Sequence, residues 1–174
     1  MAKTKPVKPF TMVRRSIWGS ARFAALPSDT DRYLYIYLLT CPHQTASGCF
    51  KLKEGYALDD LRMTGANWTA DKYRAARSDL VDSGLICHDE HTGEILISRW
   101  WQDNPPDNEA WFVGARRQCE AIESPELQRA ALAALEECYG VFLAGKELSP
   151  PAALRTGSGQ HLIDALGRHR LNAV

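Results

Sequence analysis

Two short helical patterns joined by a tight turn lie between residues 50 and 98, and they constrain the fold more than any other feature of this chain. The first pattern ends at Leu61–Arg62, and Met63-Thr64-Gly65 supplies the turn. The second pattern runs from about Thr69 to Ser83, and Gly84 is well placed as its C-cap. Together they predict a helix-turn-helix.

An apolar run broken into a hairpin follows the second helical pattern. Leu85-Ile86-Cys87 and Ile95-Leu96-Ile97 flank a polar turn, Asp89-Glu90-His91-Thr92-Gly93, and Phe50-Lys51-Leu52 precedes the first helix. Helix, turn, helix and two-stranded wing predict an α+β, mainly helical fold, with a winged helix-turn-helix over residues 12–101. The second helix of this motif has the width of a DNA major groove, so the pattern favours binding over catalysis.

The segments before this motif have their own signals. Residues 1–11 contain three lysines, and we expect a flexible basic arm there. Residues 12–18 favour a short edge strand. Ser28 is suited to cap a helix whose apolar residues 33–39 are buried, and Cys41-Pro42 is suited to end it.

A pair of helices is expected after Asn104-Pro105-Pro106-Asp107-Asn108, a rigid turn with a helix cap at its end. The first helix runs from about Glu109 to Glu123, and the second begins at Ser124-Pro125. Their apolar stripes are Trp111, Ala115, Cys119 and Ile122, and Leu127, Ala131, Ala134, Leu135, Cys138 and Phe142. Residues 102–147 thus predict an antiparallel helical hairpin, which either packs on the winged core or forms a homodimer surface. A linker and short tail, residues 148–174, follow.

The charges are unevenly distributed although the formal net charge is zero. Residues 1–28 carry six basic side chains and no acidic one, whereas residues 105–149 carry eight acidic and four basic side chains. One interpretation is a solvated, disordered basic tail. The other is a basic arm that follows the phosphate backbone of double-stranded DNA, while the acidic half faces a protein partner.

The second helix of the motif carries the first candidates for DNA contact. By helical spacing, one side of it faces inward and is formed by Thr69, Tyr73, Ala76 and Leu80. Arginine can bind guanine edges through two hydrogen bonds, and lysine can neutralise phosphate. The predicted nucleic-acid-binding residues are polar or basic and belong to this helix, the wing and the flanking segments: Arg14, Arg15, Lys51, Lys53, Lys72, Arg74, Arg77, Ser78 and His91.

A solvated helix face is the alternative for these residues. Asp71 and Ser78 have the spacing to pair with Arg74 within the helix. Asp71, Asp79 and Asp82 also lie on this helix, and their carboxylates would repel phosphates. The acidic residues of the wing turn likewise favour a plain hairpin turn there.

Metal sites and disulfides have little support in the sequence. The five cysteines are odd in number and include no Cys-x-x-Cys pair, so we interpret them as buried, reduced thiols of a cytoplasmic protein. Cys41 and Cys87 have apolar neighbours, which suits a buried thiol. Two groups of Cys and His lack the spacing of a structural zinc site: Cys41, His43 and Cys49, and Cys87, His88 and His91.

Catalytic and membrane signals are also missing from the sequence. Asp59 and Asp60 diverge by about 100° on a helix, so they cannot share a substrate. The sequence has no glycine-rich phosphate loop, nucleophile elbow or His-Glu metal motif. It has neither a secretory signal nor an apolar run of roughly 20 residues. We therefore expect a protein that is not an enzyme, holds no cofactor and does not bind a membrane.

Several short motifs, in a fixed order, carry a family resemblance over roughly residues 12–125. They are Ile17-Trp18, Arg22-Phe23 and Leu26, Tyr35-x-Tyr37-Leu38-Leu39-Thr40-Cys41-Pro42-His43, Gly48-x-Phe50-Lys51-Leu52, Gly55-Tyr56-Ala57-x-x-Asp60-Leu61, Tyr73-x-x-Ala76-Arg77-x-x-Leu80-Val81-x-x-Gly84-Leu85-Ile86 and Ile97-x-Arg99-Trp100-Trp101-x-x-Asn104-Pro105-Pro106-x-Asn108. Through these motifs the chain resembles the winged-helix N-terminal domains of bacteriophage and prophage replication initiators, also called replisome organisers.

The resemblance implies that the domain binds origin DNA in a phage genome and helps to recruit host replication proteins. Two other functions stay open. One is a protein-protein interaction module of phage origin that binds a host replisome or defence protein. The other is a winged-helix transcriptional repressor.

Overall fold

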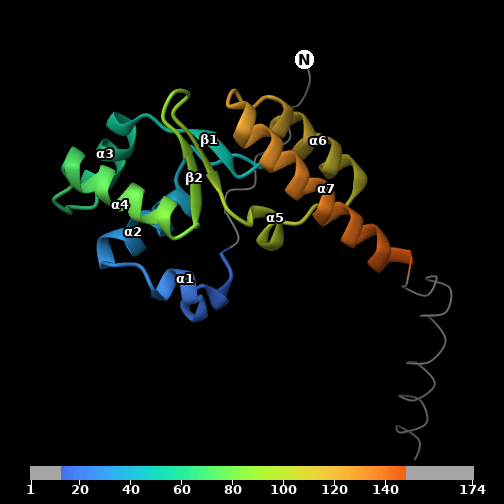
Figure 1. The fold of residues 1–174 in the computed structure, drawn as a ribbon, viewed down its shortest axis with the longest axis horizontal. Helices are drawn as coiled ribbons and strands as arrows, with labels where there is room; N and C mark the ends of the chain where they lie inside the picture. Colours follow the sequence, from blue (N-terminus) through green and yellow to red (C-terminus); the bar gives the residue numbers. More distant parts are fainter. Residues whose placement is uncertain (1–12, 148–174) are drawn as a thin grey trace, which may run out of the picture. The chain divides into compact units, whose positions relative to one another are not determined.

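The computed structural model describes residues 13–147, so the expected basic arm (1–11) and the expected linker and tail (148–174) lie outside the described residues. Within them the fold is α+β and mainly helical, as predicted, with a three-stranded antiparallel sheet (Figure 1). The chain divides into two units between Tyr139 and Gly140, and of the second unit only the end of one helix is described.

A short 3-10 helix, η1 (Arg15–Gly19), occupies the segment where we predicted an edge strand, so that prediction is wrong. The backbone N–H of Ile17 donates to the Arg14 carbonyl at 3.1 Å, and that of Ser20 donates to the Ile17 carbonyl at the same distance. These backbone bonds are local, as in a 3-10 helix, and no strand of the described sheet pairs with this segment. The one-turn helix α1 (Ala21–Ala24) follows directly.

The helix predicted after Ser28 is α2 (Asp29–Thr40), and it stops at Cys41 as expected. It is not buried on every side as predicted, because Tyr33 is exposed on the side that faces away from the core. Ser28 caps it by accepting a hydrogen bond from the backbone N–H of Asp31 at 3.3 Å. The Asp31 carboxylate in turn accepts from the backbone N–H of Ser28 at 2.7 Å, which completes a capping box. Local chemistry therefore sets the start of α2.

The two helices of the predicted motif are α3 (Glu54–Arg62) and α4 (Ala70–Asp82), joined through the predicted turn at residues 63–65. Thr69 does not face inward as expected, because it precedes α4 as the N-cap. Its exposed side chain accepts a hydrogen bond from the Lys72 N–H at 3.2 Å. α4 packs against α2, α3 and the adjoining strand β2 (Ile86–Asp89).

The predicted hairpin is formed by β2 and β3 (Glu94–Ile97). At the end of α4 the C-cap is Ser83, not Gly84 as predicted, and Gly84 follows it with a φ of +66°. Cys87 is exposed, which corrects its interpretation as a buried thiol. The reason is strand alternation, because its neighbour Ile86 already uses the buried side of β2.

The third strand, β1 (Cys49–Lys51), pairs with β3, so the sheet order is β1-β3-β2. Cys49 lies opposite Leu96, and Lys51 lies opposite Glu94. All four residues of the central strand β3 are buried. The largest fully buried side chains come from the helices and from this sheet, which share one core: Tyr73, Leu34, Leu38, Leu61, Leu80, Ile86, Ile95 and Leu135.

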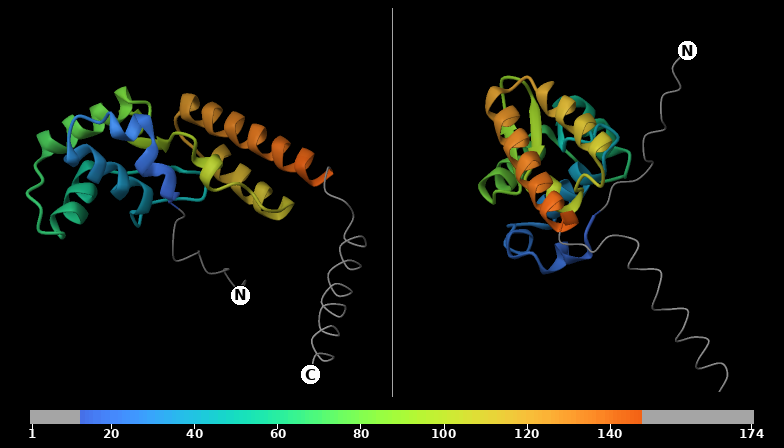
Figure 2. Two further views of the ribbon diagram at one scale, coloured as in Figure 1. Left: turned by 90° about the horizontal axis from the view of Figure 1, so that it is seen from below. Right: turned by 90° about the vertical axis from the view of Figure 1, so that its right-hand side faces the viewer.

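The helical hairpin follows the short helix α5 (Trp100–Asp103). It consists of α6 (Glu109–Glu120) and α7 (Pro125–Glu147). Asn108 caps α6 as predicted, although α6 ends at Glu120 and not near residue 123. α6 and α7 lie side by side in every view (Figures 1 and 2). They are antiparallel, because Phe112 near the start of α6 stacks on Tyr139 far along α7 at 3.9 Å.

The apolar stripe of α7 is narrower than predicted. Leu127, Ala131 and Leu135 are buried, but Ala134 is exposed. Ala134 lies about 100° around the helix from Leu135 and so falls outside a stripe built on a spacing of four residues.

Candidate nucleic-acid interface

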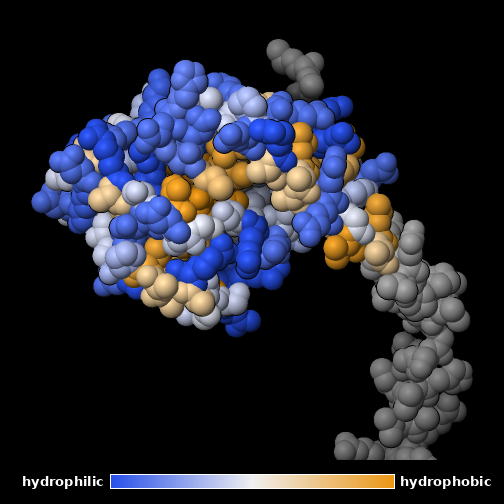
Figure 3. Space-filling model, viewed as in Figure 1, coloured by the Kyte–Doolittle hydropathy of each residue, from blue (hydrophilic) through white to orange (hydrophobic). Residues whose placement is uncertain are grey.

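The outer side of α4 is polar and exposed, as its helical periodicity predicts. Tyr73, Ala76 and Leu80 are buried on the inner side, whereas Lys72, Arg74 and Ser78 are exposed on the other. Figure 3 shows that hydrophilic residues dominate the end of the molecule formed by α3 and α4 on the face it presents. α4 is therefore held by one side and leaves the opposite side accessible.

Arg74 is engaged by carboxylates on this accessible side. Its Nε and Nη2 donate to Glu54 Oε2 and Oε1, each at 2.8 Å, and its Nη1 lies 3.4 Å from Asp71 Oδ1. Hydrogen bonds to Glu54 raise the pKa of Arg74, so the guanidinium stays charged. The predicted intrahelical pair with Asp71 is present, whereas Glu54 on α3 was missed because it lies 20 residues away.

Arg77 points toward the hairpin rather than into solvent. Its side chain is 18% exposed, and its guanidinium lies over the Tyr73 ring, 5.6 Å from the ring centroid. Its Nη2 lies 3.9 Å from Glu90 Oε1 in the turn between β2 and β3. In this arrangement Arg77 links α4 to the hairpin and is less available to an external ligand than Arg74.

Lys72 and Lys53 lie at the N-terminal ends of α4 and α3. The Lys72 ammonium lies 5.3 Å from the centroid of the Trp68 ring and 3.4 Å from the Asn67 carbonyl oxygen. Lys53 is the exposed N-cap residue of α3 and directly precedes Glu54. Neither lysine forms an ion pair with a carboxylate among residues 13–147, so both remain available to phosphate.

The tip of the hairpin is shaped by Asp89. Its Oδ1 accepts hydrogen bonds from the backbone N–H groups of His91 at 2.9 Å and Thr92 at 3.1 Å. A hydrogen bond that the carboxylate accepts from the Ser124 side chain, together with these two, lowers the pKa of Asp89. The side chain of His91 is exposed at this turn. The turn thus presents one imidazole beside two carboxylates, those of Asp89 and Glu90.

Lys51 lies apart from α4, at the turn between α6 and α7. Its Nζ lies 2.9 Å from Glu123 Oε2. In the same place the buried carboxylate of Glu94 accepts from the backbone N–H of Glu123 at 3.0 Å and of Ser124 at 2.7 Å. Sequence reasoning missed Glu94, because nothing near it in sequence shows that the start of α7 lies beside β3.

Arg14 and Arg15 lie in a third place, at η1. Arg14 Nε lies 2.6 Å from Asp103 Oδ1, and its Nη2 donates to the Gln102 carbonyl. Arg15 is exposed at the start of η1. The nine predicted residues are therefore not gathered in one cluster, and the group on α3 and α4 is the largest.

Other candidate chemistry is limited in the described part of the chain. Asp60 accepts a hydrogen bond from the Tyr37 hydroxyl at 2.8 Å and lies 3.3 Å from His43 Nε2, whereas Asp59 is exposed. Burial raises the pKa of Cys49 to about 12 and that of Cys119 to about 11, so both thiols are protonated at neutral pH. Among residues 13–147, no group of three or more Cys, His, Asp or Glu is placed to hold a metal ion.

No protein-family model, curated protein or solved structure gives a significant match to this chain. In residues 13–147, none of the helices combines the length and the apolar character that crossing a membrane requires.

Proposed function

We propose that residues 29–97 form a winged helix-turn-helix that binds double-stranded DNA, with α4 entering the major groove. The element order α2-β1-α3-α4-β2-β3 and the sheet order β1-β3-β2 support the motif. The observation that carries the DNA-binding proposal is the outer side of α4, where Lys72, Arg74 and Ser78 are exposed while the inner side is buried. A helix presented in this way fits the width of the groove.

Binding requires Arg74 to exchange its partners. In the free protein, Glu54 occupies the forked donors that would address guanine or phosphate oxygens. Lys53 and Lys72 add two positive charges to the same end of the molecule, while Asp71 and Glu54 offset two. We therefore expect modest affinity that falls steeply with salt, because phosphate contacts release counterions.

Substitution of Glu54 gives the sharpest test of this interface. Glu54→Gln removes the carboxylate that holds Arg74, so it should tighten binding to duplex DNA by about threefold to tenfold at low salt. Arg74→Ala should weaken binding by a similar or larger factor. Fluorescence anisotropy with a labelled duplex measures both effects.

Arg117→Ala, at an exposed arginine of α6, is the matched control and should leave affinity unchanged. If neither Glu54→Gln nor Arg74→Ala alters affinity, or if the wild-type protein does not bind any duplex at low salt, α4 is not a DNA-reading helix.

The biological role that we propose for DNA binding rests on the resemblance to phage replication initiators. We propose that the chain acts in replication initiation in the cytoplasm of a phage host, where it binds origin DNA and contacts host replication proteins. A transcriptional repressor of the same architecture would instead bind at a promoter. Footprinting over phage DNA distinguishes the two, because the protected site lies at an origin in one case and at a promoter in the other.

Protein binding through α6 and α7 is the second candidate function. Six acidic residues of these helices and their connecting turn are exposed, against three exposed basic residues between 109 and 137: Glu109, Glu120, Glu123, Glu126, Glu136 and Glu137, against Arg116, Arg117 and Arg129. Because it is acidic, such a surface repels DNA and favours a basic surface on a protein partner. That partner is either a host protein or a second copy of the chain. A partner that stays bound after nuclease treatment, with no DNA shift, would favour this function.

A further inference from the structure

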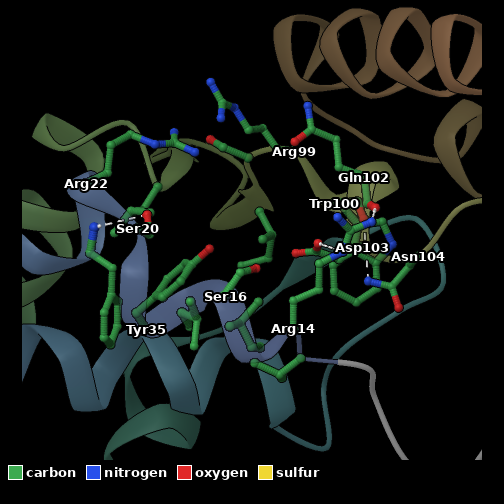
Figure 4. Close-up of a pocket in the computed structure, with 17 residues that line it drawn as sticks. Arg14, Ser16, Ser20, Arg22, Tyr35, Arg99, Trp100, Gln102, Asp103 and Asn104 are labelled. Carbon is green, nitrogen blue, oxygen red and sulfur yellow. Dashed lines mark hydrogen bonds and ion pairs between the residues drawn. The ribbon is translucent and has the colours of Figure 1, made fainter.

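A small cavity lies away from the outer side of α4, between η1 and α1 on one side and the start of α5 on the other (Figure 4). Its volume is about 140 Å³. Cavities for drug-sized ligands span roughly 300–1,000 Å³. This cavity therefore suits a single small group rather than a large organic molecule.

A tyrosine hydroxyl without a protein partner faces this cavity. Tyr35 of α2 is 8% exposed, and in Figure 4 its hydroxyl points into the space beside Ser16. None of the hydrogen bonds in the described part of the chain involves this hydroxyl. Burial raises the pKa of Tyr35, and Asp103 raises it further against the opposing effect of Arg22. The hydroxyl is thus protonated and can donate a hydrogen bond to a ligand in the cavity.

Three arginines belong to the lining of the same space. Arg22 donates through Nη1 to the Gly84 carbonyl at 2.6 Å, which leaves its other N–H groups available, and Figure 4 shows its guanidinium directed toward the cavity. Arg14 and Arg99 also line the cavity. Asp103 is the one acidic residue of the described lining, and it is paired with Arg14. The lining therefore has a surplus of cationic and donor groups.

Arg99 adds a backbone feature at the rim. Its φ is +60°, which makes it the one non-glycine residue with a positive φ among residues 13–147. This conformation costs an arginine energy, and such strained residues are concentrated at functional sites. Arg99 belongs to the lining and directly precedes Trp100, which forms part of the apolar wall.

We propose that this cavity binds a small oxyanion, specifically the phosphate group of a small molecule. The Arg22 guanidinium and the Tyr35 and Ser16 hydroxyls approach from three different elements, α1, α2 and η1. Donors that converge from separate directions match the tetrahedral oxygens of phosphate better than the two coplanar oxygens of a carboxylate. This site does not depend on α4, so it stands or falls separately from the DNA-binding proposal.

Titration of the full chain with inorganic phosphate, followed by NMR or calorimetry, tests the proposal. Sodium chloride at matched ionic strength and sodium acetate serve as the comparison salts. We expect saturable phosphate binding, with shifts at Tyr35 and its neighbours, and much weaker binding of acetate. Tyr35→Phe should reduce phosphate affinity about tenfold, the loss expected for one hydrogen bond to a charged group.

Tyr35→Phe is well suited to this test because it removes a hydroxyl that has no protein partner and keeps the buried ring, so the protein should still fold. Tyr56→Phe, at an exposed tyrosine of α3, is the matched control and should bind phosphate as the wild type does. Unchanged affinity in Tyr35→Phe would overturn the proposal. So would equal binding of acetate, or the absence of saturable phosphate binding.

Discussion

Arg77 and His88 interact where α4 packs against β2. Partial burial lowers the pKa of His88, and the positive charge of Arg77 lowers it further, against smaller opposite effects of Glu90 and Asp89. The folded protein therefore binds a proton at His88 less readily than the unfolded chain, where a histidine has a pKa of about 6.5. Stability that depends on neutral His88 is complete above about pH 6.5 and is lost as the pH falls from there through the folded-state pKa.

The pH dependence of unfolding tests this interaction. The free energy of unfolding of the wild type should fall between about pH 7 and about pH 5, and His88→Gln should make this fall shallower. Urea unfolding at a series of pH values measures it. His91→Gln, at the exposed turn, should leave the wild-type slope in place. Equal slopes for the wild type and His88→Gln would contradict the assignment.

At the scale of secondary-structure elements, a tryptophan joins α5 to the loop that leads into β1. Trp100 is buried, and its Nε1 donates to the Ala46 carbonyl at 2.8 Å. Its ring lies directly against Gly48, where an added Cβ would overlap the Trp100 side chain. Gly48 also has a φ of +71°, which a residue with a side chain rarely adopts. The approach of α5 to the sheet therefore depends on the absence of a side chain at this position.

Substitution of this glycine should be strongly destabilising. Gly48→Ala combines steric overlap with Trp100 and an unfavourable φ, so we expect a loss of about 2–5 kcal/mol in the free energy of unfolding, measured with urea. Gly93→Ala has a similar φ of +70° but no atom within 4 Å of its added Cβ. It should therefore cost only about 1–2 kcal/mol. Equal losses in the two variants would show that contact with Trp100 is unimportant.

At the scale of the molecule, the sheet and the helical hairpin are joined by one buried carboxylate. Glu94 of β3 is 6% exposed, and it accepts hydrogen bonds from two backbone N–H groups at the start of α7. A carboxylate is favoured there, because the first N–H groups of a helix lack partners within the helix and carry partial positive charge. The ion pair between Lys51 and Glu123 lies at the same junction.

Neutralising this carboxylate should loosen the junction. Glu94→Gln keeps one acceptor oxygen but places an amide donor against a backbone N–H group, so we expect a loss of about 1–3 kcal/mol in the free energy of unfolding. Glu126→Gln, in the exposed first turn of α7, removes the same charge from the same helix end. It should cost less than about 1 kcal/mol. Similar effects in the two variants would mean that the burial of Glu94 does not matter.

Much of the fold was predictable because its signals are local. The Ser28–Asp31 capping box, the apolar side of α4 and the two strands around the turn at 89–93 each depend on residues a few positions apart. The segment at η1 was not predictable in the same way. A strand needs a neighbour to pair with, and the sequence of the segment does not reveal whether one is nearby.

The candidate sites were likewise predictable only where the signal is local in sequence. Helical periodicity by itself determined that Tyr73, Ala76 and Leu80 form the buried side of α4, because a period of 3.6 residues separates the two sides of any helix. Only the tertiary structure decided that Glu54 holds Arg74, that Glu94 meets the start of α7, and that Tyr35 and Arg22 line one cavity. The residues in each of these groups are at least 13 positions apart in the sequence. Whether such residues meet depends on how the helices and strands pack, which no local sequence pattern encodes.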